Sequence, residues 1–211
     1  HDVDFYTNKI MSKNTIQDRR DWEIVTIDSL ASKDLDDALG FKHINEEETI
    51  MSIYISNIVF WMDILDLWES FADRIATIYL PDRKRPMMPT KLSDDICSLL
   101  EGKPRFAFTL DIKINRKTGK IISYSYCNSF IIVNKNLRHK TEELENSFIY
   151  NELVQISNKM NKKKIYLDSV VNSHEVVSYF MVLMNYLTAL KMKEHSAGIY
   201  RFTKSNKNYK A

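Results

Sequence analysis

The chain has 211 residues, a hydrophobic content of 44% and a charged content of 27%, which are typical of one large soluble globular domain. Its formal net charge of +2 does not indicate a nucleic-acid binder, so any such contact has to come from local basic patches. Its two cysteines form no Cys-x-x-Cys motif and its four glycines form no phosphate-binding loop, which argues against zinc, disulfide-framework, Rossmann and P-loop proteins.

The N-terminal residues 1–18 lack the apolar core of a signal peptide, and we expect them to form an extension ahead of the main domain. The longest uncharged run, Val176 to Leu190, falls short of the ~20 residues that a membrane-spanning helix needs. We therefore expect no membrane partner. The lack of a secretion signal favours an intracellular location, with the cytoplasm first and import into an organelle left open.

An acidic stretch follows a β-branched run in the first part of the chain. Residues 24–27 predict a strand, so Asp28 lies at its end. The next loop adds three aspartates, Asp34, Asp36 and Asp37. Carboxylates about 4 Å apart repel by several kcal/mol near a protein surface, so a packed group raises a pKa or binds a cation such as Mg²⁺. An ordinary acidic surface loop is the alternative, and the number of acids alone favours it.

A strand, a helix and a second distinctive motif are predicted next. Ile50 to Val59 predicts a buried strand, and the apolar residues of Leu65 to Ile75 recur at helical spacing. The motif then consists of the segments Arg74 to Arg83 (RIATIYLPDR), Pro86 to Pro89 (PMMP) and Leu92 to Leu99 (LSDDICSL).

Single residues of this motif also have structural explanations. By position alone, Tyr79 is explained by burial in a strand, and Arg83 belongs to a short basic run of the kind that solvated surfaces carry. Ser93, Asp94 and Asp95 predict the N-cap and acidic first turn of a helix. That interpretation makes the two acids structural rather than catalytic.

The clearest alternation in the chain predicts a β-hairpin. Apolar and polar side chains alternate from Phe106 to Ile114, which is typical of a strand with one face toward a core. A turn that contains Gly119 follows, and Ile121 to Val133 returns as the second strand. We interpret this hairpin as scaffold.

Two helices are predicted in the last third of the chain. The first runs from Thr141 to Asn161, with a polar outer face. The second runs from about Ser173 to Glu194, where Asn172 and Glu175 are spaced as a capping pair and Gly198 ends the element.

In order and spacing, the acidic stretch and the 74–99 motif together resemble the RNB family, the catalytic domain of ribonuclease II, ribonuclease R and the exosome-associated exonuclease. The resemblance extends from about Arg19 to Arg201. It implies an α+β fold with a mostly antiparallel or mixed sheet and packed helices, incomplete at its C-terminal side. We expect a partial RNB domain over residues 19–203 and a basic tail over 204–211.

The resemblance also implies roles for individual residues. Asp28, Asp34, Asp36 and Asp37 are expected to hold Mg²⁺, or Mn²⁺ in its place, with Asp36 as the catalytic residue that places metal or the attacking water. Tyr79 is expected to stack on a base near the RNA 3′ end, and the basic residue Arg83 to hold a phosphate.

The implied activity is that of a Mg²⁺-dependent 3′–5′ exoribonuclease, a hydrolase that releases nucleoside monophosphates. The implied partner is the 3′ end of a single-stranded RNA, with a larger ribonucleoprotein or multi-protein assembly as a second possibility. Whether these residues are active alone stays open, because family members continue into a segment that supplies an arginine for the transition state. We expect a fragment of a longer enzyme or a reduced relative.

Four positions depart from the family pattern and support an alternative function. Asn57 stands where an acid is usual, Phe60 and Thr203 where histidine is usual, and Tyr179 where glutamate is usual. The alternative is a catalytically degenerate RNB domain that binds RNA or another protein. The four intact aspartates argue against it.

Overall fold

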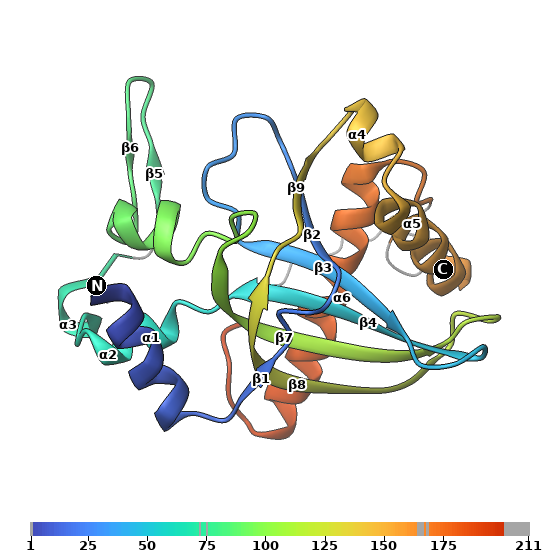
Figure 1. Ribbon diagram of the computed structural model, residues 1–211, viewed down its shortest axis with the longest axis horizontal. Helices are drawn as coiled ribbons and strands as arrows, with labels where there is room; N and C mark the ends of the chain where they lie inside the picture. Colours follow the sequence, from blue (N-terminus) through green and yellow to red (C-terminus); the bar gives the residue numbers. More distant parts are fainter. Residues whose placement is uncertain (1, 72, 75, 164–166, 168, 201–211) are drawn as a thin grey trace, which may run out of the picture.

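A mixed β-sheet forms the centre of the computed structural model, which describes residues 2–71, 73–74, 76–163, 167 and 169–200 (Figure 1). In this part of the chain the strand order is β1-β8-β7-β4-β3-β2-β9. The strands are β1 Ile16–Asp18, β2 Ile24–Asp28, β3 Asp37–His43, β4 Glu48–Ser56, β7 Pro104–Asn115, β8 Ile121–Ile132 and β9 Lys135–Arg138. The pairs β1–β8 and β2–β9 are parallel and the others antiparallel, which confirms the predicted α+β fold.

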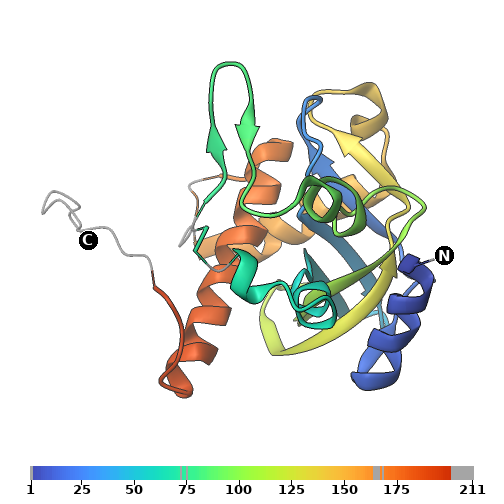
Figure 2. The same ribbon diagram turned by 90° about the vertical axis from the view of Figure 1, so that its left-hand side faces the viewer.

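Helices and a small ribbon complete the described part of the chain. The helices are α1 Asp2–Lys13, α2 Val59–Ile64, α3 Trp68–Phe71, α4 Glu142–Glu145, α5 Phe148–Met160 and α6 Ser173–Glu194, with a π-helix η1 Lys91–Ile96 and a 3-10 turn η2 Asn161–Lys163. The ribbon pairs β5 Ile78–Tyr79 with β6 Lys84–Arg85 and projects away from the sheet in both views (Figures 1 and 2). Among the described residues, no helix has the length and apolar character to cross a membrane.

The main core lies between the sheet and α6. Leu110, Ile112 and Ile114 of β7 are buried in one cluster with Phe180 and Leu183 of α6. Each fully buried side chain of this size contributes roughly 1.5–3 kcal/mol, so this contact fixes the helix against the sheet. The alternation from Leu110 to Ile114 therefore reflects burial of one strand face beneath α6, whereas Phe106 packs with α2 and Phe108 is 36% exposed.

The capping pair of α6 is present as predicted, while its end differs. The Asn172 side chain accepts a hydrogen bond from the Glu175 backbone N–H, and the Glu175 carboxylate accepts one from the Asn172 backbone N–H. The helix ends at Glu194, and Ser196, with a φ of 51°, turns the chain before Gly198 is reached. The prediction that Gly198 ends the helix is wrong because Ser196 adopts the left-handed conformation first.

Three predicted helices have different bounds in the structure. In place of one helix from Leu65, the chain forms α2 and the short α3, because Asp66 takes a positive φ of 53° between them. The predicted helix over 141–161 is divided into α4 and α5, because Ser147 caps α5 and accepts a hydrogen bond from the Tyr150 N–H. The element at Ser93 is η1, which begins at Lys91, so the predicted N-cap at Ser93 is wrong.

Residues 2–18, predicted as an extension, pack on the rest of the domain. In α1, Ile10 is 1% exposed and belongs to a cluster with Phe60 and Trp61 of α2. Strand β1 pairs in parallel with β8 at the edge of the sheet. This segment therefore shares both a core and a sheet with the residues that follow it.

One histidine on the sheet predicts a pH dependence of stability. Burial lowers the pKa of His43, the charges of Arg116 and Lys159 lower it further, and Glu152 raises it. Because the folded state favours the neutral ring, stability is full above the ordinary pKa of histidine and decreases as the pH falls below it. We expect His43→Asn, which keeps a polar atom near Thr49, to lose less in Tm than the wild type between about pH 7.5 and about pH 5.5. Equal losses in thermal melts of the two proteins would contradict this assignment.

Candidate functional site

The acidic residues meet at one end of two neighbouring strands. Asp28 is the last residue of β2 and Asp37 the first of β3, and the antiparallel register pairs Val25 with Leu39. This register returns the chain to the end of β2 after the 29–36 loop. The sheet therefore brings both strand-end aspartates to the same edge.

The charges of the four aspartates influence one another. Burial, together with the neighbouring carboxylates of Asp28 and Asp36, raises the pKa of Asp37 to about 6. The pKa of Asp28 is also raised, first by burial and then by Asp36 and Asp34, against a Thr26 hydrogen bond and the Arg138 charge, which lower it. The predicted acids are thus gathered into one electrostatic cluster.

One atom of this cluster is suited to coordinate a cation. The Oδ2 atom of Asp28 is buried and has no hydrogen-bond partner. A buried carboxylate oxygen is costly unless it is hydrogen-bonded or coordinates a metal. Because carboxylate oxygens are also the ligands that Mg²⁺ and Mn²⁺ prefer, the residues present fit a hard divalent cation in kind.

The positions of the acids fit a metal ion less well than their chemical type does. Among the described residues, no group of three or more His, Cys, Asp or Glu side chains is placed to hold a metal ion. Asp36 is exposed and Asp34 is partly buried, so the loop presents their carboxylates less deeply than β2 and β3 present theirs. The described residues therefore supply the right kind of ligand but no preformed group of three.

A cavity of about 300 Å³ lies beside the acidic loop. Asp34 and Asp36 form part of its wall, and the remainder is largely apolar, with Ile55, Pro86 and Met87 among the lining residues. Cys97 also lines it, and burial raises the pKa of this thiol to about 12, so it stays protonated near neutral pH. The cavity thus combines an acidic side with apolar walls.

The predicted RNA-binding residues lie on or beside the β5–β6 ribbon. Arg83 is exposed and forms an ion pair with Asp82, with 3.9 Å between Nε and Oδ2. Arg83 does not line the cavity, although Thr77 and Pro86, at either side of the ribbon, do. The side chain of Tyr79 lies outside the described residues, so its predicted stacking role remains a prediction. The ribbon therefore extends from the cavity wall (Figure 2).

The positions that depart from the family pattern are built into the packing. Asn57 is buried and its Nδ2 donates to Asn128 Oδ1 at 3.0 Å. Phe60 packs edge-on against Phe106, and Tyr179 is 2% exposed in the main core. Thr203 lies outside the described residues. The three described departures are therefore structural in this protein.

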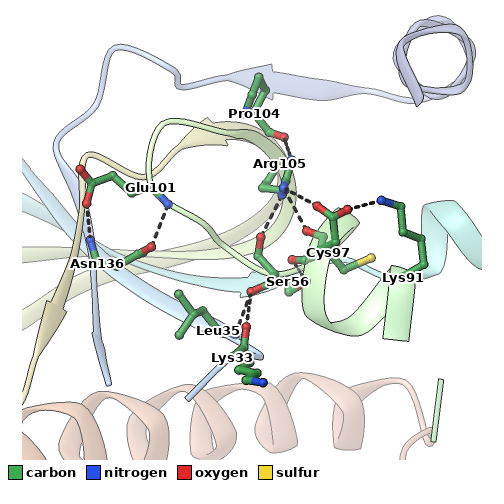
Figure 3. A network of polar contacts seen from close by, with 11 residues as sticks. Lys33, Leu35, Ser56, Lys91, Cys97, Glu101, Pro104, Arg105 and Asn136 are labelled. Carbon is green, nitrogen blue, oxygen red and sulfur yellow. Dashed lines mark hydrogen bonds and ion pairs between the residues drawn. The ribbon is translucent and has the colours of Figure 1, made fainter. Parts of the chain in front are cut away.

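Sequence reasoning missed the residues that hold the acidic loop in place. Ser98 and Arg105 belong to a polar network that joins this loop to η1 and β7, and Asn136 extends it to β9 (Figure 3). Ser98 stands in the LSDDICSL segment, so the motif itself contained the signal. Its role was invisible because hydrogen bonds between distant segments leave no periodic pattern.

The fold and the site define an α+β domain with a carboxylate cluster at a sheet edge beside a cavity. Residues 16–143 match the sequence profile described as the RNB domain. This match spans more than half of the chain, which therefore belongs to the RNB domain family. The family membership predicted from the two motifs is confirmed.

A curated relative agrees with this assignment, and solved structures agree with the fold. Ribonuclease R of Ureaplasma parvum is 35% identical over 147 residues, which are 69% of this chain and 19% of that protein. Mycoplasma genitalium RNase R in complex with ribose methylated single-stranded RNA superposes with a TM-score of 0.74 at 18% identity, over 92% of this chain and 37% of that one. The yeast pseudonuclease Ssd1 gives a TM-score of 0.73 at 13% identity, over 90% and 27%. The chain thus spans about a fifth of the curated relative it matches.

Proposed function

We propose that this chain forms part of the catalytic domain of a Mg²⁺-dependent 3′–5′ exoribonuclease that hydrolyses single-stranded RNA to nucleoside monophosphates. The observation that carries the proposal is the buried, unpartnered Oδ2 atom of Asp28 inside a cluster of four aspartates. Family membership supports the reaction class, and the name of the Ureaplasma relative supports the substrate class. An intracellular setting and a larger assembly are also part of the proposal.

The four aspartates would have different roles. Asp28, Asp34 and Asp37 would hold the cation, and Asp36 would place the cation or the attacking water. Mg²⁺, when bound, lowers the pKa of a coordinated water and stabilises the charge on phosphate oxygens. Mn²⁺ has the same preference for carboxylate oxygen and would substitute for it.

The cavity walls would position the RNA end. Apolar walls formed by Ile55, Pro86 and Met87 would displace water next to the acids once RNA fills the cavity, which would strengthen electrostatic interactions there. Tyr79 would stack on a base, since every base offers a π-face, and Arg83 would hold a backbone phosphate. The RNA would move through these contacts toward the aspartates, one nucleotide at a time.

A 5′-labelled RNA with a single-stranded 3′ end tests the proposal directly. Incubated with the chain and Mg²⁺, it should shorten from the 3′ end in single-nucleotide steps, and EDTA should stop the shortening. In a parallel reaction with uniformly labelled RNA, the products should be nucleoside monophosphates on thin-layer chromatography. Intact RNA under these conditions would contradict an activity of these residues by themselves.

A catalytically inactive RNB module is the second candidate. Two observations favour it: among the described residues no group of acids is already placed to hold a metal, and Phe60 and Tyr179 serve the core. A filter-binding measurement with the same labelled RNA separates the two functions. RNA that is bound but not shortened, with and without Mg²⁺, would support the binding module.

A further inference from the structure

The 33–36 segment, which carries two of the four aspartates, has no regular secondary structure. Its shape must therefore come from contacts with other parts of the chain. One such contact is apolar: Leu35 is 1% exposed and packs in a cluster with Leu99 and Tyr54. Burial of Leu35 anchors the residue that separates Asp34 from Asp36.

Further contacts involve a segment of three consecutive residues, Cys97, Ser98 and Leu99. The Ser98 hydroxyl accepts a hydrogen bond from the Leu35 N–H at 3.0 Å and donates one to the Lys33 carbonyl at 3.1 Å. It thus holds the peptide groups on both sides of Asp34. The Leu99 N–H donates to the Leu35 carbonyl at 2.9 Å, which closes a second link to the same loop.

The next aspartate is linked to the same three residues through Ser56. The Ser56 N–H donates to the Asp36 carbonyl at 2.8 Å, and the Ser56 hydroxyl donates to the Cys97 carbonyl at 2.6 Å. Ser56 is the last residue of β4, so this path also connects Asp36 to the centre of the sheet. Figure 3 shows Ser56, Cys97 and Leu35 close together.

A third path reaches the strand that ends at Asp28. Asn136 donates through Nδ2 to the Leu99 carbonyl at 3.0 Å and to the Thr26 hydroxyl at 3.1 Å. Thr26 lies on β2, two residues before Asp28. Residues 97–99 are therefore connected by hydrogen bonds to β2 as well as to the 33–36 loop.

Arg105 holds this three-residue segment against β7. Its Nε donates to the Ser98 carbonyl at 2.8 Å and its Nη2 to the Asp95 carbonyl at 2.9 Å, while Nη1 donates to the Pro104 carbonyl at 2.9 Å (Figure 3). A planar guanidinium with fixed donors is suited to orient several carbonyls at once. Arg105 thus holds residues 97–99 in place relative to β7, and these residues in turn hold the acidic loop.

We infer that Ser98 is a positioning residue for the cation, because its buried hydroxyl sets the backbone of the loop that presents Asp34 and Asp36. This inference rests on the proposed metal site and deepens it. Groups that orient metal ligands from outside the coordination sphere typically change metal affinity about 10–100-fold when they are removed. Ser98 acts through the loop and touches neither metal nor substrate.

Calorimetric titration of the chain with Mn²⁺, compared between wild type and Ser98→Ala, tests the inference without using activity. We expect the Kd for Mn²⁺ to rise about tenfold or more in Ser98→Ala. Ser157→Ala is the matched control, because Ser157 is also fully buried and donates its hydroxyl to the Val154 carbonyl, inside α5. The control should bind Mn²⁺ as the wild type does. Equal affinity in a folded Ser98→Ala protein would overturn the inference.

Amide hydrogen exchange gives a second readout that needs no metal. The Ser56 N–H is bonded to the Asp36 carbonyl and not to Ser98, so faster exchange at Ser56 in Ser98→Ala would show that the whole loop has loosened. If the wild type does not bind Mn²⁺, the proposed metal site is wrong. Unchanged exchange at Ser56 in Ser98→Ala would overturn the positioning role of Ser98 as well. If Ser98→Ala does not fold, Ser98→Cys, of similar shape with a weaker donor, is measured in its place.

Discussion

Asp36→Asn is expected to lower RNA hydrolysis by at least about a hundredfold, while the affinity for RNA stays close to that of the wild type. The substitution removes a negative charge with almost no change of shape. The bound ion would lose one of its carboxylate partners and would stabilise the charge of the transition state by several kcal/mol less. Each ~1.4 kcal/mol of lost stabilisation lowers the rate tenfold. Asp36 is exposed beside the cavity, so we expect the fold to tolerate the amide.

The same change at Asp66 is the matched control. Asp66 is exposed and has a positive φ of 53°, a conformation that asparagine also tolerates, so Asp66→Asn adds no strain. Rates of 3′ shortening and RNA binding constants are measured for the three proteins. Hydrolysis by Asp36→Asn at the wild-type rate would remove Asp36 from the catalytic site. Loss of RNA binding together with hydrolysis would instead assign Asp36 to substrate binding.

The sheet and the final helix could be predicted because their signals are local and periodic. From Leu110 to Ile114 the residues of β7 alternate between buried and half-buried, and Asn172 and Glu175 form a capping box that is visible in the sequence. The four aspartates were predicted as one site from a motif, and the structure brings their charges into mutual influence. Their metal ligation remains a prediction.

Other features depend on contacts that the sequence does not display. The helix predicted from Leu65 does not form as one element because Asp66 has a positive φ of 53°, and the well-buried residues of this region lie before it, in α2. The hydrogen bonds of Ser98 cross from residue 98 to residues 33 and 35. Such contacts between distant residues have no spacing rule, so they become visible only when the chain is folded.

A buried ion pair on the face of β7 opposite α6 is another contact that the sequence does not display. Arg19 is bonded to Asp111 through two parallel hydrogen bonds, with 2.7 Å from Nη1 to Oδ1 and 2.5 Å from Nη2 to Oδ2. Their side chains are 5% and 16% exposed. Ser52 donates to the same carboxylate at 2.6 Å, and the guanidinium lies over the Trp22 ring at 4.4 Å. The sequence placed Asp111 on the outer strand face but gave no partner for it.

Arg19→Met should lower the free energy of unfolding by about 3–5 kcal/mol, because it leaves the Asp111 carboxylate buried with Ser52 as its remaining donor. For a chain of this size the Tm should fall by roughly 6–20 °C in a thermal melt. Arg20→Met is the matched control, since Arg20 and its partner Asp18 are 50% and 51% exposed, and its Tm should hardly change. Adding Asp111→Leu to Arg19→Met should restore most of the lost stability. If the double variant stays as unstable as Arg19→Met, the loss comes from missing packing of the arginine and not from a stranded charge.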